Sequence, residues 1–122
     1  MTVVVCEDDE NLLELIELII LDLNINIIKC GSDDCLRETV LNNKVDLVIV
    51  DYWLKKIKAD KVIKEIQISN PEIPIILMSA VVNLSEVKEE LKVNDYVKKP
   101  FNIQVFKNKV INYIDDSKNS NN

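Results

Sequence analysis

The sequence contains no histidine among its 122 residues, and this absence removes several kinds of chemistry. Without an imidazole the chain cannot build a Ser-His-Asp triad, a Cys-His pair, a histidine general base or a histidine metal site. Any chemistry must therefore use carboxylates, hydroxyls, lysines or thiols.

Basic residues are also in short supply, with 15 lysines and arginines against 21 acidic residues and a net charge of −6. Because nucleic acids bind to basic faces, this balance argues against direct nucleic acid binding by this chain. A long apolar run is missing too: the most apolar stretch, 12–28, is interrupted by Glu14, Glu17, Asp22 and Asn24. With no basic, apolar N-terminal segment either, the sequence predicts no signal peptide and no membrane span, and we expect a soluble, cytoplasmic protein.

Cysteines are few and their spacing fits no common metal motif. Cys6, Cys30 and Cys35 are odd in number and form no CxxC pair. A zinc site would need a fourth ligand, which no histidine can supply. The sequence therefore favours buried or partly buried reduced thiols over a metal or redox role.

What the sequence does contain is a regular alternation of short apolar runs with segments of helical periodicity. Apolar runs rich in β-branched residues predict strands over 3–6, 25–30, 45–50, 75–78 and 96–98. Helices are expected over about 12–23, 33–42, 60–68, 85–93 and 103–114, with Ser32 and Asn102 as N-caps and Asn83 or Ser85 capping the fourth.

This alternation predicts an α/β fold with a parallel sheet covered by helices on both faces. For five units the economical arrangement is a flavodoxin-like, doubly wound (βα)5 sandwich with strand order 2-1-3-4-5, which binds ligands at the carboxyl ends of its strands. The length supports one domain, over residues 1–115, followed by a polar, disordered tail or the start of a linker over residues 116–122.

Polar residues follow the predicted strands at the points where they end. Glu7 and Asp8 follow the first strand, Asp51 the third, Ser79 the fourth and Lys99 the fifth. Each residue alone reads as a helix cap, a turn residue or a surface side chain. Because all of them should meet at one edge of the sheet, they predict a binding site there.

The residue types at this edge indicate a particular chemistry. Three neighbouring carboxylates repel one another and need a cation, and hard oxygen ligands suit Mg²⁺. A lysine and a hydroxyl nearby can face developing negative charge, as phosphoryl transfer requires. Asp51 lies between the two groups and is the natural carboxylate nucleophile.

These segments together resemble the receiver domain of two-component response regulators, a CheY-like phosphorelay family, from Thr2 to about Ile114. The matching stretches are Val5-Cys6-Glu7-Asp8-Asp9 with Leu12, Asp46-Leu47-Val48-Ile49-Val50-Asp51, Pro74-Ile75-Ile76-Leu77-Met78-Ser79-Ala80 and Asp95-Tyr96-Val97-Lys98-Lys99-Pro100-Phe101. Each stretch is short, but their order and spacing together are highly specific.

The resemblance implies that Asp51 accepts a phosphoryl group from the phosphohistidine of a histidine kinase, forming 4-aspartylphosphate. It implies Mg²⁺ held by Glu7, Asp8, Asp51 and the backbone carbonyl of Trp53, with Asp9 as a less critical third acid. Such a domain is not an enzyme in the wider sense, since it catalyses only its own phosphorylation and dephosphorylation.

The resemblance also implies a conformational switch. Ser79 would move onto the phosphoryl group, Lys99 would pair with it, and Tyr96 would swing inward, although a half-buried edge-strand tyrosine is the plainer interpretation. The Lys99–Pro100 bond is often cis in the family. The fourth helix, fifth strand and fifth helix would bind an effector or a second copy, with charge from Lys88, Lys92, Lys98, Lys107 and Lys109.

Two features depart from the family. The loop 54–59 lacks the usual glycine and is unusually basic. Trp53 and Val81 flank the path by which a water would attack the phospho-aspartate, and neither side chain can hold a water molecule there. This predicts slow autodephosphorylation. The alternative is that Trp53 simply covers the crevice or contacts a partner.

Other proteins of this architecture fit less well. A flavodoxin needs a hydroxyl- and glycine-rich first loop, and both a dehalogenase-type phosphatase and a Toprim site need an acid where Trp53 stands. One alternative stays open: a pseudo-receiver that acts as a phosphorylation-independent interaction module.

Overall fold

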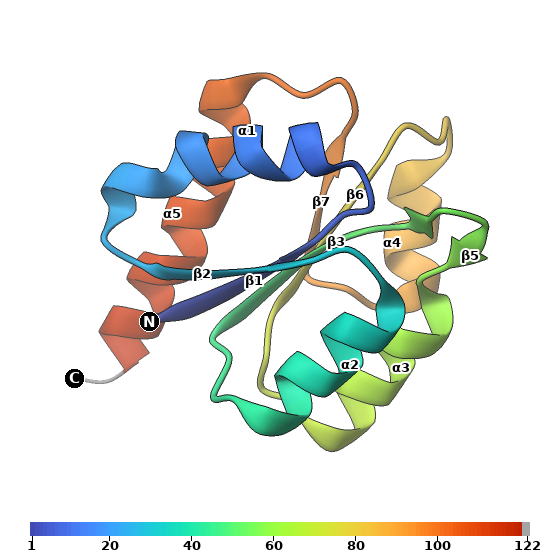
Figure 1. Cartoon of the computed structure of the whole chain (residues 1–122), viewed down its shortest axis with the longest axis horizontal. Coiled ribbons are helices and arrows are strands. Elements are labelled where there is room, and N and C mark those ends of the chain that lie inside the picture. The colour runs from blue at the N-terminus through green and yellow to red at the C-terminus, as the bar shows by residue number, and fades with distance from the viewer. Residues whose placement is uncertain (121–122) are drawn as a thin grey trace.

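The computed structural model describes the backbone of residues 1–120 and the side chains of residues 1–114. Its centre is a five-stranded, all-parallel sheet of order β2-β1-β3-β6-β7 (Figure 1). The strands are β1 (Thr2–Cys6), β2 (Asn26–Cys30), β3 (Leu47–Asp51), β6 (Ile75–Ser79) and β7 (Asp95–Lys98). This order is the predicted 2-1-3-4-5, so the predicted fold class is confirmed.

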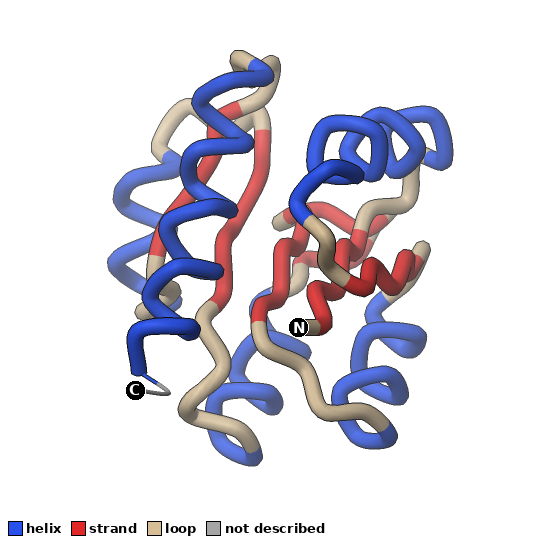
Figure 2. The backbone as a smooth tube through the Cα atoms, turned by 90° about the vertical axis from the view of Figure 1, so that its left-hand side faces the viewer, coloured by secondary structure: helices blue, strands red, loops and turns tan. Residues whose placement is uncertain are grey.

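The helices cover the sheet on both faces, and Figure 2 shows the same backbone turned by 90° about the vertical axis. Helices α1 (Glu10–Ile20) and α5 (Ile103–Ser120) lie on one face, and a short 3-10 helix η1 (Leu21–Leu23) follows α1. Helices α2 (Asp33–Asn42), α3 (Asp60–Ser69) and α4 (Leu84–Leu91) lie on the other face.

Alternating side chains of the strands feed two apolar cores. In β3, Val48 and Val50 face α2, α3 and α4, whereas Leu47 and Ile49 face α1 and α5. Because the central strands are covered on both faces, they read as continuous apolar runs in the sequence. The sheet is therefore a rigid base, and the residues just beyond its strand ends are held in place.

Polar side chains fix the starts of three helices. Asp9 Oδ1 accepts hydrogen bonds from the N–H groups of Asn11 and Leu12 at the start of α1. Ser32 Oγ accepts one from Cys35 N–H, and Asn102 Oδ1 accepts one from Gln104 N–H. The predicted caps Ser32 and Asn102 thus satisfy helix N-termini that would otherwise lack partners.

The chain after Asp51 forms a small antiparallel hairpin that the sequence did not predict. Strand β4 (Trp53–Leu54) pairs with β5 (Ile57–Lys58), and Lys55 in the turn has a φ of 60°. Two-residue strands are too short to show a period, and a lysine gives no signal for positive φ, which glycine or asparagine usually occupies. The basic loop is therefore ordered without its expected glycine.

Helix α5 continues to Ser120, beyond its expected end near Ile114. The predicted tail or linker over residues 116–122 stays a prediction, because residues 121–122 and the side chains of residues 115–120 lie outside the described residues. The Lys99–Pro100 peptide bond is cis, as the resemblance implied.

The expectation of three reduced thiols is also wrong. Cys30 and Cys35 form a disulfide, with Cα atoms 5.5 Å apart, and Cys6 is the free, buried cysteine. The short turn at Gly31–Ser32 folds the first turn of α2 back toward the end of β2. A spacing of five residues matches no common motif, so only the fold reveals this proximity.

Candidate functional site

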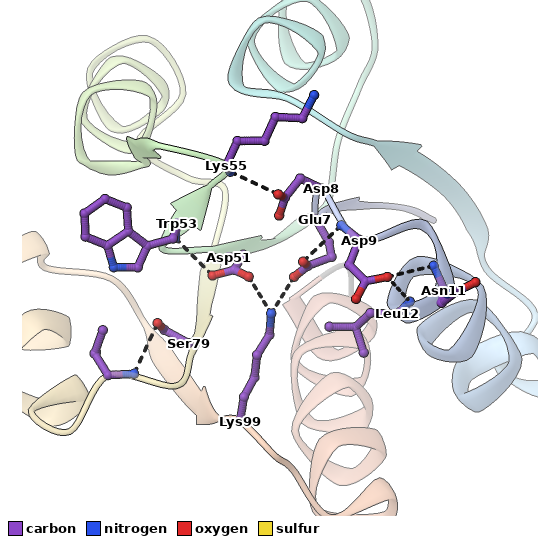
Figure 3. Close-up of polar contacts among 11 residues, drawn as sticks. Glu7, Asp8, Asp9, Asn11, Leu12, Asp51, Trp53, Lys55, Ser79 and Lys99 are labelled. Carbon is purple, nitrogen blue, oxygen red and sulfur yellow. Dashed lines mark hydrogen bonds and ion pairs between the residues drawn. The ribbon is translucent and has the colours of Figure 1, made fainter.

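The site is built at the carboxyl edge of the sheet, where three buried polar side chains gather. Glu7 directly follows β1, Asp51 ends β3 and Ser79 ends β6, and their residues are only 2%, 6% and 2% exposed. Lys99 follows β7 and reaches into the same space (Figure 3). The parallel sheet therefore brings together residues that are up to 92 positions apart in the sequence.

Lys99 is the central cation of this group. Its Nζ lies 2.7 Å from Glu7 Oε2 and also pairs with Asp51 Oδ2. Burial opposes the charge on Lys99, but its hydrogen bonds to Asp51 and Glu7 outweigh burial and raise the pKa of the ammonium group above its usual value. Lys99 is thus held as a cation facing two carboxylates.

One lysine does not neutralise the acids completely. Burial, together with a hydrogen bond to Asp51, raises the pKa of Glu7 to about 7, against the effect of Lys99. Carboxylate oxygens of Glu7, Asp8 and Asp51 all lie within 4.8 Å of one another. A hard divalent cation would stabilise this excess of negative oxygen ligands, so the residues present fit Mg²⁺.

The three consecutive acids after β1 have different roles in the structure. Glu7 and Asp8 belong to the carboxylate cluster, whereas Asp9 caps α1. Asp8 Oδ2 also accepts a hydrogen bond from Lys55 N–H, 3.1 Å away. Asp9 thus stays outside the cluster that the sequence predicted for Glu7 and Asp8.

The hairpin β4–β5 closes one side of the site through its backbone. Trp53 N–H donates to Asp51 Oδ1 over 3.0 Å, and the Trp53 residue is 40% exposed. The Nζ of Lys58 lies 5.4 Å from the centre of the Trp53 ring. The sequence did not predict the hydrogen bonds that the backbone N–H groups of Trp53 and Lys55 donate to Asp51 and Asp8. Almost every residue type carries a backbone N–H group, so the residue types do not reveal which of these groups face a site.

Ser79 and Val81 form another side of the site. Val81 N–H donates to Ser79 Oγ over 3.4 Å, and the Ser79 carbonyl accepts a hydrogen bond from Lys99 N–H at 2.8 Å. The serine hydroxyl is therefore placed on the strand next to Asp51, on the side of the sheet that leads to Lys99.

Tyr96 has its contacts elsewhere. The half-buried ring lies 5.6 Å from Lys109 Nζ and borders a shallow pocket of about 580 Å³ beside α4. Of the lysines expected on the face of α4, β7 and α5, three pair within the chain: Lys88 with Glu89, Lys107 with Asp22 and Lys109 with Asp95.

Comparison with known proteins identifies the family. The model of the response regulator receiver domain matches residues 3–111, so the chain belongs to this family of two-component signalling domains. The chain is also 29% identical over 104 residues to the transcriptional regulatory protein RprY of Bacteroides fragilis. That match covers 84% of this chain but 44% of RprY, so the chain spans less than half the length of this relative.

Solved structures show the same fold. The receiver domain of a putative Luxo repressor protein from Vibrio parahaemolyticus superposes with a TM-score of 0.88 at 20% identity, covering 98% of this chain and 94% of that one. The receiver domain of the Francisella response regulator 1452 superposes with a TM-score of 0.85 at 21% identity, covering 95% of this chain and 98% of that one. Within the described residues, no helix has the length and apolar content needed to cross a membrane.

Proposed function

We propose that this chain is a phosphoacceptor that takes a phosphoryl group onto Asp51 from the phosphohistidine of a histidine kinase. The observation that carries the proposal is the convergence of Asp51, two further carboxylates and Lys99 at one edge of the sheet. The chain has no imidazole of its own, so the donor histidine comes from the partner.

In this reaction an Asp51 carboxylate oxygen attacks phosphorus in line with the bond to the donor imidazole. The P–N bond breaks, its electron pair stays on the imidazole, and Asp51 becomes an acyl phosphate. Lys99 faces the charge that develops on the phosphoryl oxygens. Glu7, Asp8, Asp51 and the Trp53 carbonyl would hold Mg²⁺, which neutralises phosphoryl oxygens when bound.

The response to phosphorylation would begin at Ser79. Its hydroxyl is buried at the end of the strand beside Asp51 and can donate to a phosphoryl oxygen. Movement of this hydroxyl would open space toward Tyr96, which borders the pocket beside α4. The face of α4, β7 and α5 would then control an effector, a second copy or an output domain.

The remaining parts of the proposal follow from the family. The chain would work in the cytoplasm, without direct nucleic acid binding, and would catalyse only its own phosphorylation and dephosphorylation. Residues 1–115 would be the receiver, and 116–122 the start of a connection or a terminal tail.

Incubation with acetyl phosphate and Mg²⁺, followed by intact-mass measurement, tests the proposal. We expect a gain of one phosphoryl group in the wild-type chain and in Asp46→Asn, and none in Asp51→Asn. Asp46 is a matched control because its carboxylate binds the backbone N–H of Thr2 at the opposite edge of the sheet. No gain in the wild type would favour the pseudo-receiver, an interaction module that works without phosphorylation.

A further inference from the structure

A second chemically distinct feature lies where β2 meets α2. Cys30 is the last residue of β2 and Cys35 lies in the first turn of α2, with Cα atoms 5.5 Å apart. This separation suits a disulfide without backbone movement. The phosphoacceptor chemistry proposed above uses neither sulfur.

The two sulfurs differ in their access to solvent. Cys30 is 1% exposed within the core, whereas Cys35 is partly exposed on the helix. Thiol–disulfide exchange requires in-line approach to a sulfur, so a reagent from solvent must enter at Cys35. Cys30 can then react only with its neighbour.

A hydroxyl group accompanies both sulfurs. Thr39, one turn after Cys35 in α2, places its Oγ1 3.3 Å from Cys30 Sγ and 4.0 Å from Cys35 Sγ. A hydroxyl at this position can donate a hydrogen bond to a thiolate as it forms or leaves. Thr39 is therefore a positioning residue for exchange at this pair.

We propose that Cys30, Cys35 and Thr39 form a thiol–disulfide exchange site that takes small-molecule disulfides and thiols. In the oxidising direction the Cys35 thiolate attacks a disulfide RSSR, forms a mixed disulfide and releases one thiol. Cys30 then attacks the Cys35 sulfur, closes the internal disulfide and releases the second thiol. Two protein thiols are oxidised and one RSSR is reduced to two RSH.

The third cysteine takes no part in this exchange. Cys6 is fully buried and its thiol donates to the Ser32 carbonyl over 3.4 Å. Because exchange requires access to the sulfur, the buried Cys6 stays inert and serves as an internal control.

The experiment uses the reduced chain, oxidised glutathione at neutral pH, and mass spectrometry after maleimide labelling under denaturing conditions. The wild type should close the internal disulfide and leave only Cys6 to be labelled, and Cys6→Ser should close it equally fast. Cys30→Ser should hold glutathione on Cys35. Cys35→Ser should form an adduct at least about tenfold more slowly, because Cys30 is buried.

Equal rates of adduct formation at the two cysteines would overturn the assigned order, and three labelled thiols in the wild type would overturn the site itself. Cys30→Ala replaces Cys30→Ser if the serine variant does not fold. Thr39→Val should slow closure about threefold to tenfold, the effect of one hydrogen bond, and Thr39→Ser should restore it. Closure of Thr39→Val at the wild-type rate would remove Thr39 from the site.

Discussion

The two edges of the sheet both carry polar side chains, but they use them differently. At the amino edge, Asp46 accepts a hydrogen bond from Thr2 N–H at 2.8 Å, and Asn94 Oδ1 accepts one from Ile75 N–H at 2.9 Å. These side chains complete the backbone hydrogen bonding of strand starts. At the carboxyl edge, Glu7 and Asp51 are buried and share the ammonium group of Lys99.

The difference separates polar residues that serve folding from those that serve chemistry. A side chain that pairs with a backbone N–H group removes a folding penalty. Buried carboxylates that face one another add a penalty, because like charges repel in a medium of low dielectric. Such an arrangement indicates a site whose missing partner is a ligand.

The largest effect on stability is expected at Lys99. Lys99→Met leaves two buried carboxylates without a cation and should lower the free energy of unfolding by about 2 to 3 kcal/mol in the presence of a chelator. The neighbouring Lys98 is exposed, so Lys98→Met should change the free energy of unfolding by less than about 0.5 kcal/mol. Urea unfolding measures both, and equal values would mean that Lys99 is an ordinary surface charge.

A kinetic effect is expected where Trp53 and Val81 flank the acceptor. Trp53→Asn combined with Val81→Thr should admit and orient a water, and should shorten the phosphoryl lifetime about tenfold, or about 1.4 kcal/mol in activation free energy. Val82 is 91% exposed, so Val82→Thr is the matched control. The decay of the phosphorylated mass over time gives the rates, and an unchanged lifetime would leave Trp53 as a cover of the crevice.

The consecutive acids Asp8 and Asp9 give a matched pair for the cation. At ten times its dissociation constant, Mg²⁺ should stabilise the wild type by about 1.4 kcal/mol. Asp8→Asn should weaken this stabilisation, whereas Asp9→Ala should keep it and lose about 1 kcal/mol of basal stability with the helix cap. Thermal unfolding of each variant with and without Mg²⁺ measures this stabilisation as a change in melting temperature. A wild-type melting temperature that does not change with Mg²⁺ would argue against the metal site.

The smallest effect is expected at the amino edge. Asn94→Ala removes the hydrogen bond to Ile75 N–H and should cost about 1 kcal/mol, with no change in phosphorylation or in the response to Mg²⁺. Denaturant unfolding of the Asn94→Ala variant tests the expected loss of stability, and phosphoryl labelling of the same variant tests whether phosphorylation is unchanged. Loss of labelling in a folded Asn94→Ala variant would break the distinction between the edges.

The strand ends were predictable because two strong signals coincide there. Buried parallel strands read as continuous apolar runs, and polar residues end these runs: Asp51 and Ser79 are the last residues of β3 and β6, and Glu7 directly follows β1. Once the strand order was inferred from the βα alternation, their meeting at one edge followed from topology. The sequence could therefore predict which side chains gather at the carboxyl edge of the sheet, but it could not predict the distances between them.

Other features depend on contacts that residue types do not encode. The β4–β5 hairpin relies on a positive φ at Lys55, and the disulfide relies on the turn that returns α2 to the end of β2. The division between Asp8 in the cluster and Asp9 as a cap depends on where α1 begins, and sequence periodicity locates helix starts only within a few residues.

The central claim is that the phosphoryl group resides on Asp51, and chemical trapping of the acyl phosphate tests it most directly. Reduction with borohydride after exposure to acetyl phosphate and Mg²⁺ converts a phosphorylated aspartate to homoserine, which peptide mass mapping locates. We predict homoserine at position 51 and aspartate unchanged at positions 8, 9 and 46. Homoserine at any of those other positions, or at none, would contradict the account.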